Sequence, residues 1–232
     1  MRKEKRPYVI MRMTMSVDAR IAPGPDMTQF DPDPVRSLLP DESSLEKKIS
    51  KTIKADWHQG GKLYGSWTFV RKNDPVIQLP AFTGNPQELY EDFLPEEIVS
   101  KTQHWSILID GQGRYRTGYK GADTPGNHVL HVVSSSVPAE YLAFLRSEQI
   151  PYLVGGQKHA DLPDALAKLR SKLGLSAIRL MGGGTLNGVM IRENLVDEIH
   201  LVVLPALFGG YQTPTLVDCD ELTSEATLPC LD

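Results

Sequence analysis

Alternating apolar and polar positions mark the first ordered element of the chain. Val9, Met11, Met13 and Met15 alternate with residues that include an arginine and a threonine. A period of two residues is typical of a β-strand that buries one face. The sequence therefore predicts a strand over residues 8–15.

The second half of the chain carries apolar segments of two kinds in regular alternation. Short segments rich in valine, isoleucine and leucine predict strands, and longer segments with a period near 3.6 predict helices. In one expected helix the side chains of Leu162, Leu166, Leu169 and Leu173 share a face, and Gly174 stands where a helix commonly ends. The expected strands span 105–110, 128–133, 150–154, 176–181 and 198–204, and the expected helices span 139–149, 161–173 and 185–193.

This alternation of strands with helices predicts an α/β fold, in which a mostly parallel sheet is covered by helices on both faces. No internal repeat or linker divides the 232 residues, so we expect a single domain spanning 1–232. Residues 1–7 are expected to form a flexible tail, and residues 22–59 an insertion that contains a loop and a helix.

The two parts of that insertion follow from different signals. Residues 22–34 contain four prolines and a glycine, which predict a loop. Leu45, Ile49, Ile53 and Trp57 recur every four residues and predict an amphipathic helix. Residues 59–87 are rich in glycine, proline and asparagine, and no periodicity assigns them to an element.

Charge and composition narrow the function classes. The formal net charge is −4 and hydrophobic residues make up 41% of the chain, which argues against a nucleic-acid binder and for an ordinary globular protein. No apolar run approaches the roughly 20 residues that span a bilayer, and no secretory signal opens the chain. Cys219 and Cys230 form no ligand cluster with the six histidines, so we expect a cytoplasmic protein without a metal site.

The segment 176–195 is the strongest candidate for chemistry. An apolar strand leads into three consecutive glycines and then into a helix that starts near Thr185. Glycine leaves room for a ligand to approach the backbone, and the N-terminus of a helix favours a phosphate. The spacing Gly182, Gly184, Gly188 matches neither a dinucleotide-binding nor a nucleoside-triphosphate motif. A tight strand-to-helix connection without a ligand is the alternative.

Two further groups are candidates on their residue types. Asp18 follows the first strand, where a carboxylate could donate a proton to a substrate or simply close a turn. Gly65, Ser66, Trp67 and Thr68 form a small polar patch with one aromatic ring, suited either to lining a nucleotide site or to an ordinary loop.

Four segments in order along the chain resemble a known family. MTMSVDARIA at 13–22 resembles A-x-S-x-D-G-x-I-A, and YGSWTFVRKNDP at 64–75 resembles G-x-x-T-v-x-x-D-x-P. WSILIDGQGRY at 105–115 resembles a strand followed by D-x-x-G-R. GGGTLNGVMIRENLVDEIHLVVLPALFGG at 182–210 resembles the pattern that begins GG-x-T-L-x-G and ends in G-G. These patterns belong to the reductase domain of bacterial riboflavin biosynthesis, within the dihydrofolate reductase-like superfamily.

The resemblance implies a dihydrofolate reductase-like fold with a mixed, mostly parallel sheet, NADPH as cofactor and a homodimer. It implies that Ser16 and Asp18 lie near the nicotinamide and the substrate. It also implies a larger set of contacts to the cofactor, made by Ser66, Thr68, Gly182, Gly183, Gly184, Thr185, Leu186, Asn187 and Gly188.

The substrate side departs from the family pattern. Met181 stands where the family has a substrate-binding glutamate, and Ala19 stands where it has a glycine. Arg71 and Arg114 are the candidates for a ribose phosphate, and Arg114 is the stronger expectation as a substrate contact.

These features predict an NADPH-dependent reductase of a small pyrimidine- or pterin-like substrate that offers a C=N or carbonyl bond. The riboflavin-pathway 5-amino-6-(5-phosphoribosylamino)uracil reductase is an alternative, although Met181 argues against it. A nucleotide-binding protein without catalytic activity is the alternative from another class.

Overall fold

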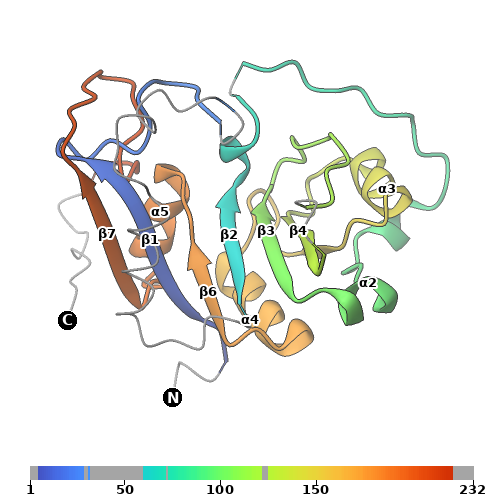
Figure 1. The fold of residues 1–232 in the computed structure, drawn as a ribbon. Coiled ribbons are helices and arrows are strands. Elements are labelled where there is room, and N and C mark those ends of the chain that lie inside the picture. Colours follow the sequence, from blue (N-terminus) through green and yellow to red (C-terminus); the bar gives the residue numbers. More distant parts are fainter. Residues whose placement is uncertain (1–4, 29–30, 32–59, 72, 122–124, 222–232) are drawn as a thin grey trace.

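The computed structural model describes residues 5–28, 31, 60–71, 73–121 and 125–221 (Figure 1). Seven strands form one sheet in the order β5-β4-β3-β2-β6-β1-β7, and every neighbouring pair runs parallel. The strands are β1 (Tyr8–Ser16), β2 (Gly61–Gly65), β3 (His104–Ile109), β4 (Asn127–Val133), β5 (Tyr152–Val154), β6 (Ala177–Leu180) and β7 (Glu198–Leu204). The mostly parallel α/β sheet predicted from the sequence is confirmed.

Antiparallel pairing is limited, among the described residues, to two isolated bridges. One joins Arg20 to Thr215 and the other joins Phe93 to Tyr152. The mixed character implied by the family resemblance is therefore confined to these bridges, outside the pairing of the named strands.

Helices cover the sheet on both faces. On β4, Leu130 and Val132 point into one apolar core, while Val129 and Val133 point into another on the opposite face. The first core contains side chains of α4 and α5, and the second contains side chains of α3. The described α-helices are α2 (Glu96–Lys101), α3 (Ala139–Ser147), α4 (Leu162–Leu173) and α5 (Gly184–Arg192).

The best-predicted element is α4, because both of its ends are specified locally. Asp161 caps it by accepting a hydrogen bond from the N–H of Asp164 at 2.9 Å. Gly174 ends it in the left-handed conformation, at φ 68°. Leu162, Leu166 and Leu169 are buried on its inner face, as the periodicity predicts.

The strand β2 and the helix α2 were not predicted. In β2 a glycine stands at each end, and Leu63 is its only large buried side chain. A methyl group at Gly61 would come within 2.6 Å of a side-chain carbon of Ile107 on β3. Close strand packing therefore favours glycine at a position that local propensity assigns to a turn.

Parts of the expected insertion and tail fall outside the described residues. The helix predicted from Leu45, Ile49, Ile53 and Trp57 lies outside them. The described part of the predicted loop, residues 22–28, contains no helix or strand. In the predicted tail, Arg6 donates two hydrogen bonds to the carboxylate of Asp197, at 2.6 and 3.0 Å. Among the described helices, none combines the length and the hydropathy that crossing a bilayer requires.

Candidate functional site

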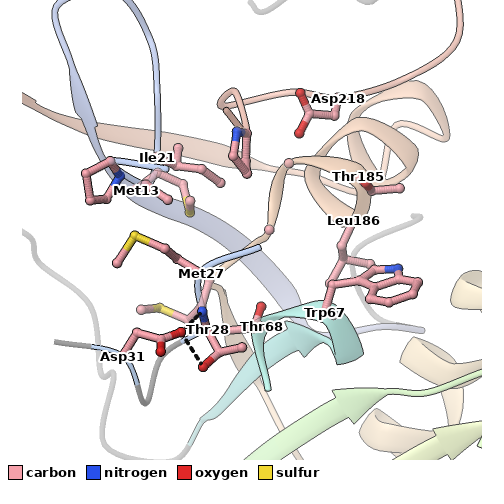
Figure 2. Close-up of a pocket in the computed structure, with 17 residues that line it drawn as sticks. Met13, Ile21, Met27, Thr28, Asp31, Trp67, Thr68, Thr185, Leu186 and Asp218 are labelled. Atoms are coloured by element: carbon pink, nitrogen blue, oxygen red, sulfur yellow. Dashed lines mark hydrogen bonds between the residues drawn. The ribbon is translucent and has the colours of Figure 1, made fainter. Parts of the chain in front are cut away.

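A pocket of about 660 Å³ lies at the carboxyl ends of β1, β2 and β6, which are neighbours in the sheet (Figure 2). Ligands of open parallel sheets commonly bind at this edge. Four stretches of chain line the pocket: Met13, Ile21, Ala22, Pro23, Met27, Thr28 and Asp31 from β1 and the loop after it; Gly65, Trp67 and Thr68 from the end of β2 and the turn after it; Met181, Gly183, Gly184, Thr185 and Leu186 from the turn after β6 and the start of α5; and Pro214 and Asp218 near the C-terminus.

The glycine turn before α5 leaves the helix end open toward this pocket. Gly182 adopts φ +86°, which favours glycine, and its carbonyl accepts a hydrogen bond from the N–H of Gly65 at 2.8 Å. Gly183 is the N-cap residue, and no side chain caps the helix. A methyl group at Gly183 would meet only a side-chain carbon of Ile21, at 4.0 Å. The first N–H groups of α5 are therefore accessible to an anion.

The other predicted cofactor contacts in this segment have different surroundings. A methyl group at Gly188 would come within 2.9 Å of the carbonyl oxygen of Asp218 and of a side-chain carbon of Cys219. Asn187 is fully buried and donates a hydrogen bond from Nδ2 to the carbonyl of Leu216 at 2.8 Å. Gly182, Asn187 and Gly188 are thus not pocket-lining residues, and the last two pack α5 against the C-terminal segment.

The patch after β2 forms the facing wall. Trp67 and Thr68 line the pocket, whereas Ser66 does not. The guanidinium of Arg114 lies 4.3 Å from the centroid of the Trp67 ring, a cation–π contact. Arg114 does not line the pocket itself, and it contacts the pocket wall through the ring of Trp67.

Asp18 and Ser16 lie beyond the pocket lining. The carboxylate of Asp18 accepts hydrogen bonds from the hydroxyl of Ser16 at 2.6 Å and from the N–H groups of Phe208 and Gly209 at 3.2 and 2.8 Å. The bond from Ser16, followed by the bond from Gly209, lowers the pKa of Asp18 to about 2. Asp18 is thus an ionised carboxylate at neutral pH that joins the turn after β1 to the loop after β7.

Sequence reasoning missed the two carboxylates of the pocket, Asp31 and Asp218. Asp31 accepts hydrogen bonds from the N–H and the hydroxyl of Thr28, at 2.7 and 3.0 Å, and pairs with Arg71. The backbone bond from Thr28 is the largest influence that lowers the pKa of Asp31. Asp31 stands in a predicted loop and Asp218 in a segment without periodicity, so neither carried a local signal.

Within the described part of the chain, no three His, Cys, Asp or Glu side chains are grouped closely enough to hold a metal ion. The polar groups of the lining residues include the hydroxyls of Thr28, Thr68 and Thr185, the carboxylates of Asp31 and Asp218, and the N–H groups at the start of α5. These groups can bind a phosphate at α5 and hydrogen-bond donors elsewhere.

Comparisons with known proteins agree with this geometry. The family described as "RibD C-terminal domain" matches residues 7–231. The chain is 38% identical to a 2,5-diamino-6-ribosylamino-4(3H)-pyrimidinone 5′-phosphate reductase of Methanothermobacter thermautotrophicus, over 92% of this chain and 84% of that protein. It is 32% identical to the protein of the same name from Aquifex aeolicus, over 92% of this chain and 83% of that protein.

Solved structures show the same fold at low sequence identity. A pyrimidine reductase-like protein from Corynebacterium diphtheriae superposes with a TM-score of 0.59 and 15% identity, covering 94% of this chain and 83% of that chain. The riboflavin biosynthesis reductase Rib7 of Saccharomyces cerevisiae superposes with a TM-score of 0.54 and 15% identity, covering 94% of this chain and 81% of that chain.

Proposed function

This chain belongs to the RibD C-terminal domain family, and we propose that it is a reductase that uses a nicotinamide cofactor, with NADPH preferred. Its substrate is proposed to be 2,5-diamino-6-ribosylamino-4(3H)-pyrimidinone 5′-phosphate, which the relatives at 38% and 32% identity are named for. The observation that carries the proposal is the uncapped start of α5, which faces a pocket at the carboxyl ends of three neighbouring strands.

A dinucleotide fits the residues present. The N–H groups at the start of α5 would bind its pyrophosphate, and the open side of Gly183 would admit the phosphate to the backbone. Thr185 would add a hydroxyl donor, while Thr68 and Trp67 would line the opposite side. The bound cofactor supplies hydride, and the residues of this chain orient it. The preference for NADPH over NADH rests on the family likeness.

The substrate half is proposed to lie between the loop after β1 and the end of β6. Met13, Met27 and Met181 present a largely apolar surface there, which suits the face of a planar heterocycle. Thr28 and Asp31 bring the polar groups, and a carboxylate can accept hydrogen bonds from ring amino groups. The thioether of Met181 is only a weak acceptor for such a bond, so the loop after β1 is expected to orient the ring.

The proposed reaction adds hydride to the sugar carbon of the ribosylamino group, in its open C=N form, and a proton to the nitrogen. Because the pKa of Asp18 is about 2, its carboxyl carries little proton at neutral pH. We therefore propose water as the proton source, and Asp18 as a residue that positions the loop after β7. The proton-donor role predicted for Asp18 from the sequence remains a prediction that the Asn variant tests.

The proposed oligomer is a homodimer that uses β7. Among the described strands β7 pairs with β1 alone, so it stands at an edge of the sheet. Leu201 and Val203 are 43% and 53% exposed on this strand, and Leu207 beyond it is 76% exposed. An apolar edge strand promotes association unless a partner covers it.

The test of the function is a turnover assay that follows oxidation of NADPH by the purified protein. We expect turnover with 2,5-diamino-6-ribosylamino-4(3H)-pyrimidinone 5′-phosphate, and slower turnover with its uracil counterpart. NADH should support the reaction with a higher KM. Binding of NADPH without turnover of either substrate would favour a nucleotide-binding protein, and absence of NADPH binding would refute the proposal.

A further inference from the structure

A strap formed by residues 213–219 closes one side of the pocket. The N–H of Ile21 donates to the carbonyl of Pro214 at 3.1 Å, and the N–H of Leu216 donates to the carbonyl of Ala19 at 3.0 Å. The N–H of Asp218 donates to the carbonyl of Gly184 at 3.0 Å. The strap is therefore attached both to the turn after β1 and to the first residue of α5.

The strap places the carboxylate of Asp218 against the start of α5. Figure 2 shows Asp218 beside this helix, near Thr185 and across the pocket from Asp31. One carboxylate oxygen, Oδ1, accepts hydrogen bonds from the N–H of Thr215 at 3.1 Å and from its hydroxyl. The other oxygen, Oδ2, packs so closely on Gly184 that a methyl group there would overlap it. Glycine at position 184 thus makes room for a carboxylate of the chain itself.

The two carboxylates of the pocket differ in their charge partners. Asp31 forms an ion pair with Arg71, whereas no cation of the described residues pairs with Asp218. The positive end of the α5 dipole is the favourable electrostatic partner that lies next to Asp218. The same helix end is where the proposed function requires a phosphate.

We propose that Asp218 is a resident anion of the α5 N-terminus, which occupies the field of that helix end in the empty protein and weakens the binding of phosphate ligands there. The inference rests on the proposed function, since that function places the cofactor pyrophosphate at α5. An arriving phosphate meets a like charge a short distance away, and the helix dipole already stabilises that charge. Asp218 therefore sets the affinity of the site and favours ligands that gain enough contacts elsewhere in the pocket.

The experiment is calorimetric titration of the full chain with inorganic pyrophosphate and, separately, with NADPH. Asp218→Asn keeps the shape of the side chain and removes its charge, so both ligands should bind about three- to thirty-fold more tightly. The gain should shrink as salt rises, because exposed charges are screened. Asp220→Asn is the matched control, since Asp220 is an exposed carboxylate two positions along that does not line the pocket. It should bind both ligands as the wild type does.

Affinity in Asp218→Asn that equals the wild-type value would overturn the inference, and so would a gain that salt does not diminish. Weaker binding would overturn it too, because it would make Asp218 a direct contact to the ligand. Asp218→Ser, which also removes the charge and keeps a polar side chain, repeats the test if the Asn variant does not fold. Tighter pyrophosphate binding without any NADPH binding would uphold the resident anion and refute the proposed cofactor. NADPH affinity that is equal in the wild type and in every variant would uphold the proposed cofactor and refute the resident anion.

Discussion

Two regions along the carboxyl edge of the sheet hold their polar side chains in opposite ways: a closed end at β3 and β4, and an open end at β1, β2 and β6. At the β3–β4 end, the carboxylate of Asp110 accepts hydrogen bonds from the N–H groups of Arg114 and Tyr115, at 3.0 and 2.9 Å, and from the hydroxyl of Tyr141 at 2.7 Å. The oxygen of Tyr141 also lies 2.9 Å from Nδ1 of His131. At the β1–β2–β6 end, the N–H groups that start α5 have no capping side chain, and Asp218 has no cationic partner among the described residues.

Burial accounts for the behaviour of the closed end. Desolvation lowers the pKa of His131 to about 4 and raises that of Tyr141 well above its ordinary value, so both are neutral near pH 7. Because the hydroxyl proton of Tyr141 goes to Asp110, the proton of neutral His131 lies on Nδ1. Hydrogen bonds satisfy the carboxylate of Asp110 and the hydroxyl of Tyr141 and stabilise the fold, although Nε2 of His131 has no partner among the described residues. The open end, by contrast, keeps its hydrogen-bonding capacity for a ligand. Variants at the closed end should therefore change stability, and variants at the open end should change binding.

The largest effect is expected at the closed end. Tyr141→Phe removes a hydroxyl that serves a buried carboxylate and a buried imidazole, so the free energy of unfolding should fall by about 2–3 kcal/mol. Chemical denaturation measures this loss, and NADPH affinity should stay at its wild-type value. Tyr211→Phe is the control, because Tyr211 is fully exposed and should change neither quantity. A loss of NADPH affinity in the folded Tyr141→Phe protein would contradict the division between the two ends.

The next effect is expected in the glycine turn. Gly183→Val places a branched side chain where a phosphate must approach, so NADPH affinity should fall by roughly 50-fold with little change in stability. Gly184→Val is the contrasting variant. Its side chain would overlap Asp218 and the carbonyl of Thr215, so its unfolding free energy should fall by about 1–3 kcal/mol. Unchanged NADPH affinity in Gly183→Val would mean that the phosphate does not bind at this turn.

A smaller effect is expected at the β7 edge, outside the pocket. The double variant Leu201→Lys, Val203→Lys places charges on an exposed apolar row, so the dissociation constant of the dimer should rise at least about tenfold. Light scattering over a concentration series measures this change. Val76→Lys, at a residue that is 46% exposed in a loop, is the control and should leave the mass unchanged. A wild-type protein that is monomeric at micromolar concentration would refute the proposed dimer.

The smallest effect on turnover is expected for Asp18→Asn. If Asp18 positions the loop after β7, turnover should stay within about threefold of the wild type, whereas loss of a proton donor typically lowers the rate by about 10²–10⁴. Stability should fall at neutral pH, because the ionised carboxylate accepts three hydrogen bonds.

The pH dependence of this stability loss has a definite sign. The pKa of Asp18 is lowered from 3.8 to about 2, so its contribution is present above pH 4 and is lost as pH falls toward 2. The melting temperatures of wild type and Asp18→Asn should therefore converge in acid. A fall in turnover of two orders of magnitude, with folding intact, would restore the proton-donor role.

The elements that the sequence determined by itself are those whose signals are local. The leucine period, the Asp161 cap and Gly174 specify α4 within about a dozen residues of chain. The glycine turn between β6 and α5 is equally local, and its place at the carboxyl end of a strand follows from the parallel sheet. Family resemblance added the cofactor and the reaction; the matching family and the named relatives confirm the reductase class, while NADPH stays a prediction.

Only the tertiary structure decided which of the candidate residues face the pocket. Gly183 lies open to it and Gly188 packs on the strap, although both belong to one glycine-rich segment. Asp18 binds N–H groups about 190 residues further along the chain, and Asp218 reaches the start of α5 from the strap. Such contacts depend on how crossover connections bring distant segments to one edge of the sheet. Local periodicity and spacing therefore do not predict that arrangement.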